Sequence, residues 1–584
     1  MPNIPWFDRE ETLSILEKRL NGFLAGYRKN IAVLGPEGIG KSTLIRRLLQ
    51  QRADSCQSLI PLYVEIQEEE NFSEWGARFI QVLLYNLLQA SRFKTVSDSS
   101  DSEVLSTELP KLLKLCFSIA PETTASAQRL LALAEAGRAE EAYDRLWDLP
   151  YLMSQELDKS CLLVLDEFHR LGNLGIKDPF GRLGRKIMVQ NMTMYLVVSS
   201  QPGIARSVLR EGLSLLFGQF ETLFVYPLHP AACIQALRDV LSRERGNPFL
   251  EQLLMELTQG IPAYLDLFLQ GLVNCPGSKT ESTDAERYLL DLLESLLLEP
   301  QGALRVRFEA QIRSLPAHQS RRSWMEVLMT VAAGHHRVLQ ISELTHRFSS
   351  QVLRALKVLE GAGLVEKQGV FYRLHDRLFQ LWILTAYPVL RGIDLTDPAH
   401  ARIRFRDASW AWMARIHEAN TRSMEEHGVA LLRQWGGELV EIEGRRIYLP
   451  RFKRVELIKT PTGRSAIVAH RDDRKGKGWL VIPWRGVLEE GEAGSLVKEV
   501  LNLPSQDYRK VIFGAHPVEV NARLVFQEAR IRFWDLAVFN NLLDLYGLVR
   551  IPFPEESRRG SFESVPIGPG TVQPQFPSGL SQAT

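Results

Sequence analysis

The sequence predicts an α/β fold built on a parallel sheet, and three observations support this prediction. Residues 31–34 (I-A-V-L) indicate a short buried strand, which leads into a glycine-rich turn and then a helical pattern. Residues 161–165 (C-L-L-V-L) form a second apolar run, which ends in two carboxylates. Further apolar runs alternate with amphipathic segments, as is typical of a parallel sheet covered by helices on both faces. In such a sheet the ligand site is expected at the carboxyl ends of the strands.

Length and composition limit the class of protein. A chain of 584 residues is long enough for about three or four domains, and 45% hydrophobic with 24% charged residues is ordinary for soluble globular protein. The formal net charge is +1, so any nucleic-acid binding has to come from a local patch. The five cysteines lack C-x-x-C spacing, which argues against a zinc site or a disulfide framework. With no apolar signal core or transmembrane-length run, we expect a cytoplasmic protein without membrane contact.

The glycine-rich turn completes the P-loop signature G-x-x-x-x-G-K-[ST]. Nine consecutive residues are therefore candidates for binding a nucleotide: Gly35, Pro36, Glu37, Gly38, Ile39, Gly40, Lys41, Ser42 and Thr43. The glycines allow a tight turn whose N–H groups point at phosphate oxygens. Lys41 is placed to reach the β- and γ-phosphates, and the Ser42 hydroxyl to hold Mg²⁺. A chance glycine-rich turn is the alternative, but the strand before and the helix after the motif favour nucleoside triphosphate binding.

The two carboxylates after residues 161–165 indicate a Walker B motif. Asp166 is expected to bind Mg²⁺ through water, and Glu167 to polarise the attacking water. Two acids after an apolar run also arise by chance, but their place in the same domain as a P-loop favours the functional interpretation. A further strand, at residues 194–198, ends in Ser199 and Ser200. Either serine is a candidate sensor of the γ-phosphate, although a helix N-cap for the next segment explains them equally well.

Other segments complete the predicted core, which we assign to residues 1–228. Residues 59–66 and 222–226 indicate two more strands. The helix expected at residues 5–30 opens with F-D-R-E, which either borders the nucleotide base or is an ordinary helix start with acidic first-turn residues. The polar, acidic run at residues 94–107 predicts a flexible surface insertion.

The rest of the chain divides into four predicted parts. Residues 229–320 indicate a helical lid and linker, in which G-I-P at 260–262 separates two helices. Residues 321–392 show three helical patterns and a hairpin, which together predict a winged helix. Residues 393–553 form a mixed α/β region, and 554–584 a disordered tail rich in Pro, Gly and Ser.

The third helix of the predicted winged helix is the candidate recognition helix. It exposes Gln351, Arg354 and Lys357 on one face, which we interpret as a DNA-contacting surface. Winged helices also serve as protein-contact modules, so double-stranded DNA and protein partners both stay open.

The order of these motifs resembles the archaeal-type ATPases of the AAA+ and STAND P-loop NTPase lineage. The matching pieces span residues 1–390: F-D-R-E, G-P-E-G-I-G-K-S-T-L, V-L-D-E-F-H-R-L, T-Q-G-I-P-A-Y-L and Y-R-L-H-D-R-L-F-Q-L-W. The resemblance implies an AAA+-like fold that binds ATP and Mg²⁺ through Lys41, Ser42, Asp166 and Glu167. It also implies a switch with slow turnover more than a steady metabolic catalyst.

The sequence departs from this family at two places. The family tends to have L-Y-G-R before the last strand, whereas this chain has L-F-G-Q ending at Gln219, so Arg206 or Arg210 would have to replace the missing arginine. Relatives often carry a C-terminal domain similar to restriction endonucleases. Glu456 would supply its first acid, but residues 467–471 (I-V-A-H-R) lack the second carboxylate and the lysine that two-metal hydrolysis needs. We therefore expect a degenerate nuclease-like domain, without nuclease activity, that is kept for binding.

The leading functional prediction is an ATP-hydrolysing switch that couples nucleotide state to DNA binding through the winged helix. The competing hypothesis is a STAND-type signalling or scaffold ATPase whose C-terminal domains bind protein partners or a second copy. An active nuclease is the weakest of the three alternatives.

Overall fold

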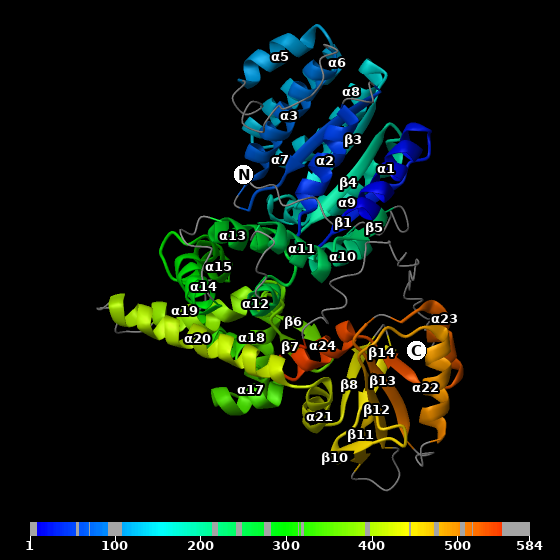
Figure 1. Cartoon of the computed structure of the whole chain (residues 1–584). Coiled ribbons are helices and arrows are strands. Elements are labelled where there is room, and N and C mark those ends of the chain that lie inside the picture. Colours follow the sequence, from blue (N-terminus) through cyan, green and yellow to red (C-terminus); the bar gives the residue numbers. More distant parts are fainter. Residues whose placement is uncertain are drawn as a thin grey trace, which may run out of the picture. The chain divides into compact units, whose positions relative to one another are not determined.

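The chain forms two compact units in a computed structural model (Figure 1). One unit comprises Met1–Ala232 and Gly260–Leu267, and the other comprises Cys233–Gln259 and Phe268–Thr584. The structure describes residues 9–53, 58–68, 70–91, 108–212, 220–240, 248–273, 282–313, 315–316, 320–391, 398–442, 445–471, 478–502, 508–516 and 518–551. The predicted insertion at 94–107, the predicted tail and Gln219 lie outside these residues. The finer division into core, lid, winged helix and C-terminal domain stays a prediction.

A five-stranded parallel sheet forms the centre of the first unit, in the order β2-β3-β4-β1-β5. This confirms the predicted α/β fold with a parallel sheet. The strands are β1 (Asn30–Leu34), β2 (Leu59–Glu65), β3 (Ser160–Asp166), β4 (Thr193–Ser199) and β5 (Phe220–Phe224). All residues of β1 and β4 are buried, as expected for strands covered on both faces.

The position of β5 differs from the prediction by two residues at each end. The apolar run 222–226 suggested the strand, but β5 pairs with β1 from Phe220 to Phe224. β5 is an edge strand and is only half-buried, so its apolar residues mark its limits less clearly than those of the central strands. The Val225 N–H still donates to the Leu34 carbonyl at 2.8 Å, and the chain then leaves the sheet.

Helices pack around this sheet (Figure 1). They are α1 (Glu10–Leu24), α2 (Lys41–Ala53), α3 (Phe72–Ser91), α5 (Leu109–Phe117), α6 (Pro121–Glu135), α7 (Ala139–Leu146), α8 (Leu149–Leu157), the 3-10 helix η1 (Phe168–Asn173), α9 (Pro179–Val189), α10 (Pro202–Ser207) and the π-helical turn η2 (Val208–Gly212). The core between α3, α7 and the sheet is rich in aromatic rings. The rings of Trp75 and Trp147 lie 5.8 Å apart, and Tyr143 packs edge-on against Trp147 at 5.4 Å.

The second unit begins with helices. They are α11 (Pro230–Val240) and α13 (Pro262–Val273), which both cross the division between the units, then α12 (Pro248–Thr258), α14 (Ser282–Leu297), α15 (Ala303–Arg313), α19 (Arg377–Arg391), α20 (Pro398–Thr421) and α21 (Met424–Gln434). The G-I-P segment separates α12 from α13, as its Gly and Pro predict. Among the described residues, no helix has the length and apolarity to cross a bilayer.

Three short helices and a hairpin precede α19. They are α16 (Arg321–Ala332), α17 (Val338–Thr345), α18 (Ser349–Gly361) and the antiparallel strands β6 (Glu366–Gln368) and β7 (Phe371–Arg373). α18 buries Val352, Leu356 and Leu359 and contacts α16 and α17.

The C-terminal part of the second unit contains a mixed sheet in the order β10-β11-β12-β13-β14. Its elements are the hairpin β8 (Glu438–Ile442) and β9 (Arg445–Leu449), β10 (Phe452–Lys459), β11 (Ser465–Arg471), β12 (Trp479–Trp484), α22 (Glu490–Asn502), β13 (Arg509–Gly514), α23 (Val520–Glu528), β14 (Arg532–Trp534) and α24 (Leu536–Leu545). Trp479 and Val481 belong to one apolar core, and Leu480 and Ile482 to another, so β12 is buried on both faces. Phe371 of β7 lies in the first of these cores, which joins the hairpin to the C-terminal sheet.

Candidate nucleotide-binding site

The turn between β1 and α2 has the geometry that its glycines predict. Gly38 has φ +78° and Gly40 φ +93°, in the left-handed region that favours glycine. A Cβ at Gly35 would lie 2.7 Å from the Val225 carbonyl oxygen, so only glycine allows this close approach to the chain leaving β5. The glycines of the motif therefore stand where the backbone of the loop requires them.

Lys41 begins α2 and turns back toward the loop. Its side chain is buried, with the residue 4% exposed, and Nζ donates to the Pro36 carbonyl at 2.9 Å. A second cation comes from before the sheet: the buried Arg9 donates from Nη2 to the Ile39 carbonyl at 3.2 Å. Two positive charges thus lie against the loop, which suits a polyphosphate. Arg9 belongs to the F-D-R-E motif, one interpretation of which places it beside the nucleotide base, but the sequence did not predict its contact with the loop.

Asp166 joins the loop to the end of β3. Its Oδ2 accepts hydrogen bonds from Ser42 Oγ at 2.7 Å and from the Tyr63 hydroxyl, and its Oδ1 accepts the Glu167 N–H at 2.9 Å. Burial and the charge of Asp166 raise the pKa of Tyr63, so this hydroxyl stays protonated and donates. Tyr63 was not predicted as a site residue. Its position on β2, which pairs with β3, indicates a contact with Asp166 only when the strand pairing is known.

Ser42 and Asp166 supply the oxygen donors that Mg²⁺ prefers. Asp166 is only 3% exposed, and its oxygens already accept three hydrogen bonds, so these residues fit an ion held through water better than one bound directly. Within the described ranges, no group of three or more His, Cys, Asp or Glu is arranged to hold a metal. A single carboxylate with phosphate and water ligands is the usual arrangement for Mg²⁺ at nucleotides.

Glu167 follows Asp166 in a left-handed conformation, with φ +53°. Its Oε2 accepts the N–H of Ser200 at 2.9 Å and the Ser200 hydroxyl at 2.8 Å. Burial raises the pKa of Glu167, and the Ser200 hydrogen bonds and the Lys41 charge oppose part of that rise. A positioned carboxylate with a raised pKa is suited to accept a proton from water.

His169 completes this network between β3 and β4. Its Nδ1 lies 2.9 Å from Ser199 Oγ and 3.4 Å from Glu167 Oε2. Burial, with the charges of Arg170 and Lys41, lowers the pKa of His169 to about 4, so the ring is neutral at pH 7. His169 lies within the motif V-L-D-E-F-H-R-L, but the sequence alone predicted no role for it.

The two serines turn out to differ. Ser200 contacts Glu167, whereas the Ser199 hydroxyl accepts the Gln201 N–H at 3.1 Å as the chain enters α10. The N-cap position of α10 is Gln201, so neither serine occupies it. Both hydroxyls therefore lie in the network around Glu167 and His169.

The two arginines predicted to take the place of the arginine missing at Gln219 follow β4. Arg206 lies over the ring of Phe224, with Cζ 4.4 Å from the ring centroid, and both Arg206 and Arg210 are largely exposed. Their role toward a γ-phosphate stays a prediction.

The segment between α12 and α13 contacts the P-loop directly. The Ala263 N–H donates to the Gly38 carbonyl at 3.2 Å, and the Leu228 N–H donates to the Gly260 carbonyl at 2.9 Å. Gly260 has φ +72°, and a Cβ there would lie 2.6 Å from the Leu228 carbonyl oxygen. The position therefore requires glycine.

The predicted DNA-contacting residues lie on the exposed face of α18. Arg354 and Lys357 are exposed, and within the described part of the chain neither has a carboxylate partner. Gln351 is also exposed, but its Oε1 accepts the Phe348 N–H at 3.2 Å, so it already serves at the start of the helix. In the C-terminal sheet, Glu456 is paired with Arg454 at 2.5 Å and lies 4.0 Å from His470 Nε2.

Residues 5–177 match the family model of the AAA ATPase domain. This span contains the loop, Asp166 and Glu167, so the nucleotide-binding part of the chain is similar to AAA ATPase domains. No protein with a curated description matches the chain.

Three solved structures resemble the chain distantly. A Walker-type ATPase of Pyrococcus abyssi is 14% identical, with 65% of this chain and 95% of that chain covered, at a TM-score of 0.39. The ORC2 protein of Aeropyrum pernix with ADPNP and ADP is 14% identical, with 69% and 95% covered, at 0.40. The ORC1 protein of Aeropyrum pernix in complex with DNA is 17% identical, with 66% and 95% covered, at 0.33. At these TM-scores the likeness assigns neither fold nor function to the whole chain.

Proposed function

We propose that this chain is an ATP-hydrolysing switch whose nucleotide state controls the binding of double-stranded DNA through α18. The observation that supports the nucleotide half most strongly is the 2.7 Å hydrogen bond between Ser42 and Asp166. It brings together two motifs that lie 124 residues apart in the sequence, each suited to the same ligand.

The residues around this bond have complementary roles in the proposal. The loop N–H groups and Lys41 bind the β- and γ-phosphates, while Ser42 and, through water, Asp166 hold Mg²⁺. Mg²⁺ supplies charge neutralisation for the phosphates. Glu167, fixed by Ser200, orients and polarises the attacking water, and its raised pKa favours acceptance of the proton. Ser199 and His169 hold the adjacent backbone and are suited to detect the γ-phosphate.

The proposed coupling of nucleotide state to DNA binding rests on two contacts. One lies before the Gln259–Gly260 peptide bond in the sequence and the other lies after it. In the first unit, Ala263 is bonded to Gly38 of the P-loop. In the second unit, Gln259 Oε1 accepts the Arg377 N–H at 3.0 Å at the start of α19. Because Gln259 and Gly260 are chain neighbours, a displacement of the G-I-P segment on nucleotide binding reaches α19 through the backbone.

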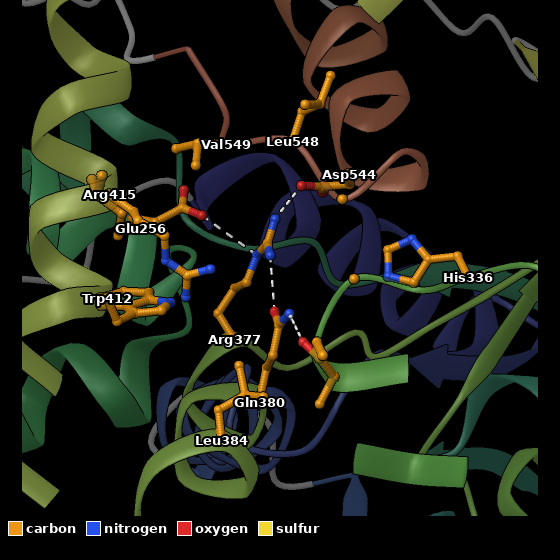
Figure 2. Close-up of a pocket in the computed structure, with 15 residues that line it drawn as sticks. Glu256, His336, Arg377, Gln380, Leu384, Trp412, Arg415, Asp544, Leu548 and Val549 are labelled. Carbon is orange, nitrogen blue, oxygen red and sulfur yellow. Dashed lines mark hydrogen bonds and ion pairs between the residues drawn. The ribbon is translucent and has the colours of Figure 1, made fainter. Parts of the chain in front are cut away.

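In the proposal, Arg377 passes such a displacement on through its contacts with several elements of the second unit, which Figure 2 shows. Its Nε lies 3.4 Å from Glu256 of α12, and its Nη1 donates to Gln380 at 2.9 Å. A third contact is the ion pair with Asp544 of α24. These residues line a polar cavity of about 80 Å³ beside α16 and α20. α19 also packs on α16, which contacts α18, so the path leads to the helix with Arg354 and Lys357.

Asp544 keeps this junction charged. Although burial raises the pKa of Asp544, the charges of Arg377, Arg550 and Arg373 outweigh it and hold the pKa below its ordinary value. Removing one partner of a buried ion pair usually costs about 3–5 kcal/mol, so the junction is a fixed joint and not a loose surface contact.

The proposal is tested by measuring duplex DNA affinity in a Glu167→Gln variant with ATP and with ADP. Allosteric couplings are typically about 1–3 kcal/mol, so we expect the two affinities to differ by roughly 5- to 150-fold. Gln259→Ala removes the contact to Arg377 and is expected to reduce this ratio while leaving ATP binding intact. Equal affinities with both nucleotides would refute the switch.

A signalling or scaffold function is the second candidate, because large apolar side chains are exposed beside the DNA-contacting face. Leu339 is 71% exposed, Phe348 78% and Leu344 53%, on α17 and at the start of α18. Exposed apolar clusters mark protein contacts more often than nucleic-acid contacts. If the partner is a protein, Phe348→Ser should weaken its binding with little dependence on salt, whereas DNA binding should fall steeply with salt.

A further inference from the structure

The stretch of sequence around β9, β10 and β11 is unusually rich in cations. Residues 445–477 contain eleven Lys and Arg but only three Asp and Glu, in a chain whose overall net charge is +1. So strong a local excess is a sequence-level sign of a polyanion partner.

The strand pairing shows that many of these cations share one end of the sheet. β11 ends where β10 begins, because Phe452 pairs with Arg471. β12 starts beside the end of β11, and β13 and β14 run parallel to β12. The starts of β10, β12, β13 and β14 and the end of β11 therefore form one edge, which we call the strand-start edge. Its basic residues include Arg451, Lys453, Arg454, Arg471, Arg509, Lys510, Arg530 and Arg532.

Arg509 and Arg532 belong to neighbouring strands at this edge, and Arg445, at the start of β9, is near enough for its charge to act on Arg532. Burial, together with the charges of Arg509 and Arg445, lowers the pKa of the Arg532 guanidinium. Its Nη1 atom is buried and has no hydrogen-bond partner within the described part of the chain. Arg445 and Arg509 are exposed, and among the described residues neither has a carboxylate partner. Clustered like charges of this kind do not stabilise the fold, and an external anion would relieve both the repulsion and the unpaired N–H.

Aromatic rings position two guanidinium groups at the same edge. Arg509 Cζ lies 5.3 Å from the Trp479 ring centroid, and Arg471 Cζ lies 5.8 Å from that of Tyr448. Contacts of this kind restrict an arginine before any ligand arrives, which reduces the entropy lost on binding.

We propose that the strand-start edge binds the phosphate backbone of double-stranded DNA, as a second contact surface separate from α18. Arginine predominates over lysine here, and its planar fork matches the phosphate oxygens in pairs. Five strands about 4.8 Å apart span about 19 Å, the length of roughly six base pairs. Contacts to phosphates alone position a duplex without reading its sequence, so this surface binds unrelated duplexes alike. The inference does not depend on ATP coupling, because no residue of the nucleotide site takes part.

The test compares variants of the full chain in binding a 20-base-pair duplex across a salt series. Arg445→Gln with Arg509→Gln changes two exposed residues and should lower the log–log salt slope by about 2. Between 50 and 200 mM salt, the fold-loss in duplex affinity of this double variant should then be about tenfold smaller than that of the unmodified chain. Arg532→Gln removes the half-buried member and should lower the slope by about 1.

Lys459→Gln with Arg464→Gln is the matched control. These cations lie at the opposite end of β10 and β11, and their loss should leave the slope unchanged. ATP hydrolysis and the melting temperature serve as folding checks for every variant. Arg354→Ala with Lys357→Ala, measured alongside, separates a failure of the α18 proposal from a failure of this one.

Two outcomes would overturn the inference. One is an unchanged salt slope in both the Arg445/Arg509 double variant and Arg532→Gln. The other is a poly-glutamate peptide that binds the full chain as tightly as the duplex and loses affinity in the same variants, because the partner would then be an acidic protein.

Discussion

The nucleotide site and the exposed face of α18 differ in how firmly the fold fixes them. Around Asp166 and Glu167, polar groups from β2, β3, β4 and α2 are hydrogen-bonded to one another, and the pKa values of Tyr63, Glu167 and His169 are displaced. On α18, Arg354 and Lys357 extend into solvent without carboxylate partners among the described residues. The nucleotide site therefore holds its functional groups in fixed positions, whereas the face of α18 offers only exposed charge. The proposed role of the nucleotide site is for this reason more specific than that of α18.

The largest effect is expected from Lys41→Ala, which removes the ammonium beside the phosphate loop. ATP binding, followed with a fluorescent ATP analogue, should be lost. The exposed Lys18 of α1 is the matched control, and Lys18→Ala should bind as before. Unchanged binding by a folded Lys41→Ala protein would show that the loop is not the nucleotide site.

Glu167→Gln should keep ATP binding and lower turnover by about 10²-fold or more, the usual scale for a general base or a water-orienting group. The amide keeps an oxygen for the Ser200 hydrogen bonds but accepts no proton. Glu65 at the end of β2 is an exposed carboxylate beside Asp166 in the sheet, and Glu65→Gln should hydrolyse ATP normally. Similar phosphate release from both variants would move catalysis to another residue.

Acid should destabilise the first region through His169. The folded pKa of His169 is about 4, below the ordinary 6.5, so the unfolded chain binds more protons between these values. The free energy of unfolding therefore falls as the pH drops from 6.5 toward 4, by about 2 kcal/mol at pH 5. Thermal melts of His169→Asn should show less of this decline. An equal decline in the unmodified chain and in His169→Asn would contradict this prediction.

The smallest effect is expected on α18. Arg354→Ala combined with Lys357→Ala should weaken duplex binding and reduce the log–log salt slope by about 2 if both residues contact phosphates. ATP hydrolysis should be unchanged. Gln351→Ala should have a lesser effect on DNA, because its oxygen is already bonded to the Phe348 N–H. A slope that stays constant in the double variant would favour a protein partner for this face.

Sequence alone predicted the features that lie within short stretches. The P-loop, the buried strands that precede it and Asp166, and the break at G-I-P are all local patterns of residue type. Tyr63 and Arg9 were missed as site residues because their partners, Asp166 and Ile39, lie 103 and 30 residues away, and only the folded chain brings them together. The limits of β5 were misplaced because a half-buried edge strand leaves a weak apolar pattern.

The left-handed backbone at Glu167 lowers the stability of the fold at the residue proposed to activate water. A glutamate in this conformation costs of order 1 kcal/mol, and its carboxylate is buried against its ionic preference. Asparagine tolerates the same φ more readily, so Glu167→Asn should melt no earlier than the natural chain while losing turnover. Screens that select only for heat resistance would therefore tend to erase the residue proposed to activate water. Thermal stability and hydrolysis are best selected together in any engineering of this chain.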